Sequence, residues 1–329
     1  MSSSHSTWRS GLVSRVEALL TWRKARKARK AEKQRQKNVV VDWIEAFIWA
    51  AFVVLLVNQY LLQAYQIPSG SMINTLELQD RIFVNKLVYG PELIPGMFKL
   101  PGFETPERGE VIIFENPSYI GRGPLFDVLQ RVIYMLTLSL VDIDRDERGR
   151  PRAHFLIKRA VGYEGDRIRL RYGEVEIRPA GSDRWYSEEE FKQFTRQEYP
   201  VQRLIDRDEY ATFSLAGRAS ALSDAGLGIT ESEGEAIREV SRMGLIDPFF
   251  LERSRTATLY QIDPTEERLR RRVNSLETGY YVPRARLFPL GDNRDNSRDA
   301  RYFGSVTKRT VLGRAMFVYW PFSRFGAIR

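Results

Sequence analysis

Residues 154–171 read HFLIKRAVGYEGDRIRLR, and this stretch decides the fold. It holds two short runs rich in apolar and β-branched side chains, residues 154–161 and 166–171, with glycines between them. Short runs of this kind, bounded by Gly, Pro or Asp, are typical of β-strands. Three further runs share the pattern: RIFVN at 81–85, EVIIFE at 110–115 and VLGRAMFVYW at 311–320. The sequence therefore predicts a mostly β fold built on an antiparallel sheet.

The sequence changes character between the two halves of this β core. Residues 182–277 are rich in charged, helix-compatible stretches, such as 187–193 and 230–243. We therefore expect a core made of residues 67–181 and 278–329, with an inserted, partly helical subdomain at 182–277.

An apolar segment precedes the β core. Residues 46–57 (AFIWAAFVVLLV) are all apolar, and the wider stretch 43–66 carries one formal charge, at Glu45. About 20 apolar residues in a helix span the hydrocarbon core of a bilayer. The sequence therefore predicts a transmembrane anchor at 43–66, with the lipid bilayer as a partner. A cleaved signal peptide fits poorly, because 42 residues precede the segment.

The basic charge of the chain is concentrated before this anchor. The net charge is +9, and residues 1–42 hold 11 of the 51 Lys/Arg residues but 3 of the 42 Asp/Glu residues. The rest of the chain is nearly neutral, so we expect no nucleic-acid partner. Cations that flank a span stay on the cytoplasmic side. We expect a basic cytoplasmic arm at 1–42, a single crossing of the inner membrane, and the domain after Pro68 on the outer side.

A second apolar stretch, residues 125–141 (LFDVLQRVIYMLTLSLV), is shorter and contains Asp127 and Arg131. Its apolar residues recur every three or four positions, which favours an amphipathic helix over a second span. We expect this helix to lie at the membrane surface or to pack on the core.

Composition excludes several chemistries. The chain has no cysteine, which excludes disulfides, thiolate metal sites and thiol nucleophiles. Of its two histidines, His5 lies in a polar tail, so His154 is the only plausible imidazole base. The acidic run 142–146 lacks the glycine and glutamate that a calcium loop needs, and we expect an exposed turn there. The sequence indicates no metal and no cofactor.

Four motifs follow the anchor in order: IPSGSM at 67–72, QDRIFVNK at 79–86, KRAVGYEGDRI at 158–168 and GDNRDNSRD at 291–299. In these motifs and their order the chain resembles the bacterial type I signal peptidases, the leader peptidases with a Ser/Lys dyad. The matching blocks cover under half of the chain: 41–90, 109–115, 156–170 and 286–325.

The resemblance implies roles for particular side chains. Ser71 is the expected nucleophile and Lys158 its general base. Ser69 is expected to add its hydroxyl to the oxyanion hole, and Ser297 to orient the lysine amine. Structural support is expected from Asp292, Arg294, Asp299 and Arg301, the last two as an ion pair.

The chain departs from the family pattern at four positions, none of which removes a catalytic atom. The family has proline, glycine, proline and serine where this chain has Asn74, Gln79, Glu164 and Ala300.

The chemistry of Lys158 is consistent with this role. A lysine base that works near neutral pH needs a pKa about 2–3 units below its ordinary ~10.4. Burial among apolar neighbours has this effect, and Lys158 follows Phe155, Leu156 and Ile157. Taken alone, Lys158 would rather indicate an exposed edge-strand lysine. The neighbouring motifs favour the role of a base.

The sequence thus predicts a membrane-bound serine endopeptidase that removes signal peptides from exported preproteins. The resemblance implies small residues at the first and third positions before the cut. Two alternatives stay open. One is another Ser–Lys hydrolase, such as a self-cleaving repressor, which the anchor disfavours. The other is a non-enzymatic, membrane-tethered β module whose basic arm binds lipid or nucleic acid.

Overall fold

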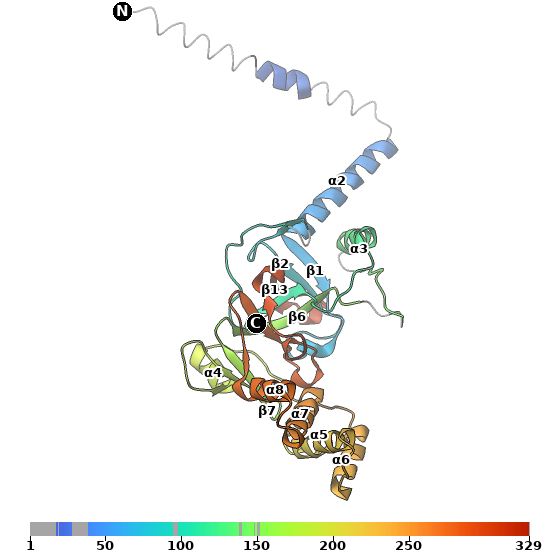
Figure 1. Ribbon diagram of the computed structural model, residues 1–329. Helices are drawn as coiled ribbons and strands as arrows, with labels where there is room; N and C mark the ends of the chain where they lie inside the picture. The colour runs from blue at the N-terminus through green and yellow to red at the C-terminus, as the bar shows by residue number, and fades with distance from the viewer. Residues whose placement is uncertain are drawn as a thin grey trace, which may run out of the picture. The chain divides into compact units, whose positions relative to one another are not determined.

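The computed structural model describes residues 18, 20–27, 39–94, 98–137, 140–147, 149 and 152–328 (Figure 1). Most of the predicted arm at 1–42, His5 included, lies outside these residues. The chain divides into two units after Val54, and the second unit begins at Leu55.

An antiparallel sheet forms the centre of the second unit and confirms the predicted β fold. Its order is β1, β2, β13, β5, β6, β11, β12, with β14 paired to β13. β13 therefore lies between β2 and β5, and β6 lies between β5 and β11. The strands are β1 Leu62–Gln66, β2 Arg81–Asn85, β5 Val111–Glu115, β6 Phe155–Tyr163, β11 Arg286–Leu290, β12 Val306–Thr307, β13 Val311–Trp320 and β14 Gly326–Ala327.

A second, smaller sheet has the order β10, β7, β8, β9, and β3 pairs with β4 in a separate ribbon. The predicted run at 166–171 forms its strand β7. The strands are β7 Arg167–Arg171, β8 Glu174–Arg178, β9 Tyr186–Ser187, β10 Tyr280–Tyr281, β3 Glu92–Ile94 and β4 Phe98–Lys99.

The segment between β9 and β10 is helical, which confirms the expected change of structure in the insert. Its helices are α4 Glu188–Thr195, α5 Glu209–Asp224, α6 Glu231–Arg242, α7 Pro248–Ile262 and α8 Glu267–Thr278. Local sequence sets where they begin: Ser187 and Thr230 each form a capping box with a glutamate three residues later. Helices α5, α6 and α7 pack together, and α8 lies against α7 and β7 (Figure 1).

The predicted anchor is helix α2, Val39–Tyr60, which is long and apolar enough to cross a membrane. It ends earlier than the predicted segment, and Leu62–Gln66 form strand β1 instead. The polar residues near its end explain this boundary. Asn58 is buried and its Oδ1 accepts a hydrogen bond from Ala64 N (3.4 Å), while Gln59 Nε2 donates to Glu92 O (2.9 Å).

Helix α3, Pro124–Leu136, occupies most of the second apolar stretch. One face packs on the β domain, where Tyr134 contacts Tyr65 and Arg131 lies over the ring of Phe155. The opposite face is exposed, with Leu125, Val128 and Leu129 among its side chains. Residues 138 and 139 of the predicted helix lie outside the described residues.

The expected exposed acidic turn at 142–146 is wrong for Asp144, whose side chain is completely buried. Its carboxylate accepts a hydrogen bond from the Tyr119 hydroxyl (3.0 Å) and lies 3.0 Å from Arg122 Nε and 3.0 Å from His154 Nε2. Three long-range partners outweigh the cost of burying the charge. His154 is therefore committed to this structural cluster.

Candidate active site

The turn after β1 holds Ser71 in a short 3-10 helix, Gly70–Met72. The neighbouring side chains of Met72 and Leu76 are buried in the core beside Ile82 of β2. Because these buried apolar side chains fix the turn, Ser71 is held in place although it is not part of the apolar cluster. Ser71 is 7% exposed.

Two departures from the family pattern lie in this turn and carry unusual backbone. Asn74 has φ 79° and Gln79 has φ 67°. Proline is restricted to φ near −65°, so the family's proline could not adopt the conformation seen at Asn74. Asparagine tolerates it better than most residues. At Gln79 the same left-handed conformation is one that glycine would adopt at lower cost.

Lys158 reaches this turn from β6. Its Nζ lies 2.6 Å from Ser71 Oγ and 2.9 Å from Ile157 O, and the residue is 3% exposed. Strand β6 has neighbours on both sides in the sheet, which excludes an exposed edge-strand lysine. A hydroxyl and a buried amine in direct contact form the pair that proton transfer between them requires.

The protein lowers the pKa of the Lys158 amine to about 8. Loss of hydration on burial is the main cause, because it disfavours the charged form. The carboxylates of Asp299 and Asp292 act in the opposite direction and limit the shift. The amine therefore titrates near physiological pH rather than remaining fully protonated.

The two other candidate serines are close to Ser71 but differ in their contacts. Ser69 is exposed, with its Oγ 3.5 Å from Ser71 Oγ. Ser297 is buried and packs with the Ser71 carbonyl against Gly291, where a Cβ would lie 2.1 Å from Ser297 Oγ and 2.6 Å from Ser71 O. Among the described residues, the Ser297 hydroxyl makes no hydrogen bond to the Lys158 amine.

Asp292 joins the loop after β11 to the strand that carries Lys158. Its carboxylate accepts hydrogen bonds from Arg159 Nε (2.8 Å) and Nη2 (2.6 Å) and from Thr75 Oγ1 (2.6 Å). Arg159 and Asp292 are both fully buried. A pair of this kind is costly to break from one side, since the remaining charge is left unpaired.

Asn293 holds the Ser71 turn directly. Its Nδ2 donates to Gly70 O (3.0 Å) and its backbone N–H donates to Ser71 O (3.1 Å). Asn293 thus fixes the carbonyl groups of both Gly70 and Ser71.

The remaining predicted loop residues make ion pairs inside the protein. Arg301 Nε lies 2.8 Å from Asp299 Oδ1, and Gly291 N donates to Asp299 Oδ2 (2.9 Å). Burial acts to raise the pKa of the Asp299 carboxyl, but Arg301 and these hydrogen bonds outweigh it and the pKa is lowered. Arg294 pairs with Glu188 of α4, its Nη2 2.7 Å from Oε1.

The structure therefore brings Ser71, Lys158, Ser69 and Ser297 into one site, with the ionic residues behind it. Sequence reasoning missed Arg159 and Asn293. A signal for Arg159 was present, because it is a charged residue beside Lys158 in an otherwise apolar strand. Asn293 lies inside a quoted motif, but nothing in the sequence shows which motif residue faces the serine.

An apolar helix leading into a β domain whose serine contacts a buried lysine is the arrangement of a membrane-anchored serine peptidase. The model of the family described as signal peptidase, peptidase S26, matches residues 40–320. This match covers most of the chain, so the chain belongs to that family. It is a hydrolase, a membrane serine endopeptidase that removes signal peptides from preproteins.

Individual relatives agree with this assignment. The chain is 26% identical to signal peptidase I of Pseudomonas aeruginosa over 90% of its length and 82% of the relative. It is 26% identical to that of Haemophilus influenzae over 88% of this chain and 73% of the relative. For Aquifex aeolicus the identity is 24%, over 81% and 79%.

Proposed function

We propose that Ser71 and Lys158 carry out the cleavage of the signal peptide. The observation that supports this most directly is the 2.6 Å contact between Ser71 Oγ and the Nζ of a lysine that is 3% exposed. The neutral amine accepts the hydroxyl proton while Oγ attacks the scissile carbonyl. The resulting ammonium then protonates the leaving amine, and the same amine activates the water that releases the acyl group.

In this proposal the other two serines assist the pair. The Ser69 hydroxyl and the Ser71 N–H stabilise the oxyanion, a role that the 3.5 Å approach of Ser69 to Ser71 supports. Ser297 orients the Lys158 amine, and its packing beside Ser71 on Gly291 supports this assignment.

The test is preprotein cleavage by the full chain in detergent. Ser71→Ala is expected to abolish cleavage, because no nucleophile remains. Ser69→Ala is expected to lower kcat by about 10²–10³-fold, the usual effect of removing one oxyanion donor. Unchanged thermal unfolding serves as the control for folding in both variants. A Ser71→Ala protein that cleaves at the wild-type rate contradicts the proposal.

We also propose a topology and a substrate preference. The basic residues before α2 support a cytoplasmic arm and a catalytic domain on the outer side of the inner membrane. Protease added to intact spheroplasts should then digest the domain and spare the arm, and digestion of the arm alone contradicts this topology. The family resemblance supports small residues at the first and third positions before the cut, which substitutions in a preprotein at these positions test.

Helix α3 is proposed to lie at the membrane surface. Its exposed face is apolar, while its other face packs on Tyr65, which follows α2 by five residues. An extended chain of five residues spans about 17 Å, so α3 is held near the end of the anchor. An amphipathic helix in such a place buries its apolar face in the interface.

A further inference from the structure

The helical insert is joined to the loop that holds the nucleophile turn. Residues 196–208, between α4 and α5, form what we call its entry segment. This segment passes the loop at Gln202, whose N–H donates to Asp292 O (2.8 Å) and whose carbonyl accepts from Arg294 N (3.0 Å). These two bonds enclose Asn293, and Asn293 in turn holds the carbonyls of Gly70 and Ser71. Only Asn293 therefore lies between this part of the insert and the Ser71 turn.

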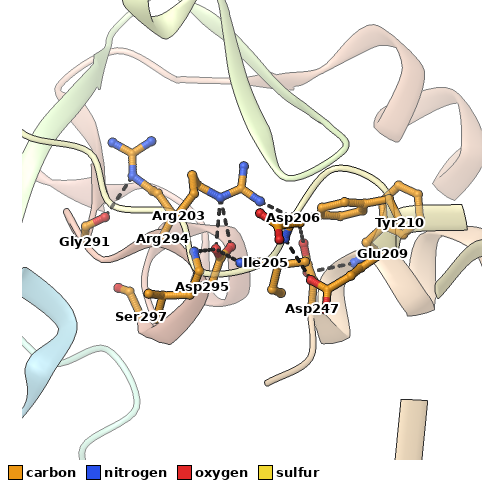
Figure 2. A network of polar contacts seen from close by, with 12 residues as sticks. Arg203, Ile205, Asp206, Glu209, Tyr210, Asp247, Gly291, Arg294, Asp295 and Ser297 are labelled. Carbon is orange, nitrogen blue, oxygen red and sulfur yellow. Dashed lines mark hydrogen bonds and ion pairs between the residues drawn. The ribbon is translucent and has the colours of Figure 1, made fainter. Parts of the chain in front are cut away.

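A buried carboxylate strengthens this junction. The side chain of Asp295 is 1% exposed and accepts hydrogen bonds from Arg203 Nε (3.0 Å), Leu204 N (2.6 Å) and Ile205 N (3.0 Å) (Figure 2). The guanidinium and two backbone N–H groups all come from the entry segment of the insert. Asp295 thus fixes this segment to the loop through three groups at once.

The same arginine continues the network into the helices. Arg203 Nη2 donates to the Tyr210 hydroxyl (2.6 Å), and this hydroxyl donates to Asp247 Oδ2 (3.2 Å). Tyr210 is buried on α5, and Asp247 caps α7 by accepting from Phe250 N (3.0 Å). Figure 2 shows Arg203 between Asp295 on one side and Tyr210 on the other. The position of the loop is thereby tied to the two helices at the centre of the insert.

We infer that Arg203 is a positioning residue for the cleavage reaction, which holds the 291–299 loop, and through Asn293 the Ser71 turn, in its working place. The inference rests on the proposed role of Ser71. Within the described part of the chain, Arg203 makes no hydrogen bond or ion pair with Ser71 or Lys158, so it acts through the loop. The insert is then part of the catalytic support and not only an appendage of the β domain.

The first test is the kinetics of Arg203→Gln in the full chain, with preprotein cleavage followed over substrate concentration. A misplacement of about 1 Å can cost up to 10²-fold in rate, so kcat should fall by about 10–100-fold while KM stays within about twofold. Asp295→Asn should lower kcat similarly, and the double variant should be no slower than the slower single variant. Multiplying effects in the double variant overturn the pairing.

A matched control separates positioning from general weakening of the insert. Thr230→Ala removes the cap of α6 and should destabilise this helix, without touching Arg203 or the loop. It should leave kcat unchanged. An equal loss of kcat in Thr230→Ala overturns the inference, because the insert's stability and not the Arg203 contact would then set the rate.

Hydrogen exchange supplies a readout on the loop itself. The amides of Asn293 and Arg294 should exchange faster in Arg203→Gln and at the wild-type rate in Thr230→Ala.

A conservative variant provides a further test. Arg203→Lys keeps a cation opposite Asp295, so its kcat should lie between those of Arg203→Gln and the wild type. If Arg203→Gln does not fold, Arg203→Lys replaces it in the test, with a smaller expected loss of kcat. Wild-type kcat in the Arg203 variants, together with an inactive Ser71→Ala, overturns this inference alone, whereas an active Ser71→Ala overturns the proposed function.

Discussion

Two lysines, Lys158 in β6 and Lys86 just after β2, are buried to a similar extent but contact different atoms. Lys86 is 6% exposed and its Nζ donates to Gln59 O (3.3 Å) in the last turn of α2. Its pKa is lowered to about 7, mainly by burial and also by the charge of Arg131, while Glu92 acts against the shift. Lys158, with a pKa of about 8, contacts a hydroxyl instead.

This difference shows that a lowered pKa does not by itself identify a catalytic base. Burial is the largest cause of the lowered pKa at both lysines. A carbonyl can only accept a hydrogen bond, so the Lys86 amine caps the helix end whether or not it is charged. A hydroxyl has a proton to give. Of the two amines, Lys158 alone is placed to take one from Ser71.

The largest expected effect comes from the same substitution at both lysines. Arginine cannot be deprotonated in a protein, so Lys158→Arg should lower the rate of preprotein cleavage by about 10²–10⁴-fold, the usual contribution of a general base. Lys86→Arg keeps a donor for Gln59 O and should retain activity within about threefold. Thermal unfolding of both variants checks the fold. An active Lys158→Arg enzyme removes the distinction between the two sites.

The pH profile sharpens the comparison. Below its pKa the Lys158 amine is protonated and cannot accept the Ser71 proton, so kcat/KM should rise with pH and level off above about 8. Well below this value the rate should fall about tenfold per pH unit. Lys86→Met should leave the midpoint unchanged, although Lys86 titrates in the same range. A midpoint that moves in Lys86→Met contradicts the assignment of the pH profile to Lys158.

The smallest expected effect concerns helix α3, whose Arg131 lowers the pKa of Lys86. The experiment tests whether the exposed face of this helix lies at the membrane surface. The chain has no cysteine, so Val128→Cys on the exposed face of α3 can carry a single polarity-sensitive fluorophore in the full chain reconstituted in liposomes. Its emission should shift to shorter wavelength and resist an aqueous quencher. Leu227→Cys, exposed between α5 and α6, is the control. Equal quenching at both positions contradicts a membrane-surface α3.

Much of the fold could be predicted because it depends on local pattern. The runs at 81–85 and 311–320 coincide with β2 and β13, and the charged texture of 182–277 indicated helices. The environments of Lys86 and Asp144 could not be predicted in this way. Lys86 follows a strand and looks exposed in sequence, but the end of α2 covers it; Asp144 has its partners in other segments.

The site was predictable in its residue types but not in its contacts. The motifs pointed to Ser71 and Lys158, yet their meeting depends on residues 87 positions apart in the chain. Asp292, Asn293 and Asp295 lie in one short motif and face Arg159, the Ser71 turn and Arg203 respectively. A tight loop has no regular alternation, so its side-chain directions do not follow from spacing, as they do in a strand.

The place of β13 in the sheet has a consequence for how the enzyme is made. Strands β1 and β2, which precede and follow Ser71, form one pair; β5 and β6, which carries Lys158, form another; β13 joins the two. Synthesis produces β13, Val311–Trp320, after all four of these strands. A growing chain therefore holds Ser71 and Lys158 on separate halves until β13 has emerged. We therefore expect proteolytic activity only after β13 has been made, and we expect removal of residues 311–320 to separate the two halves again.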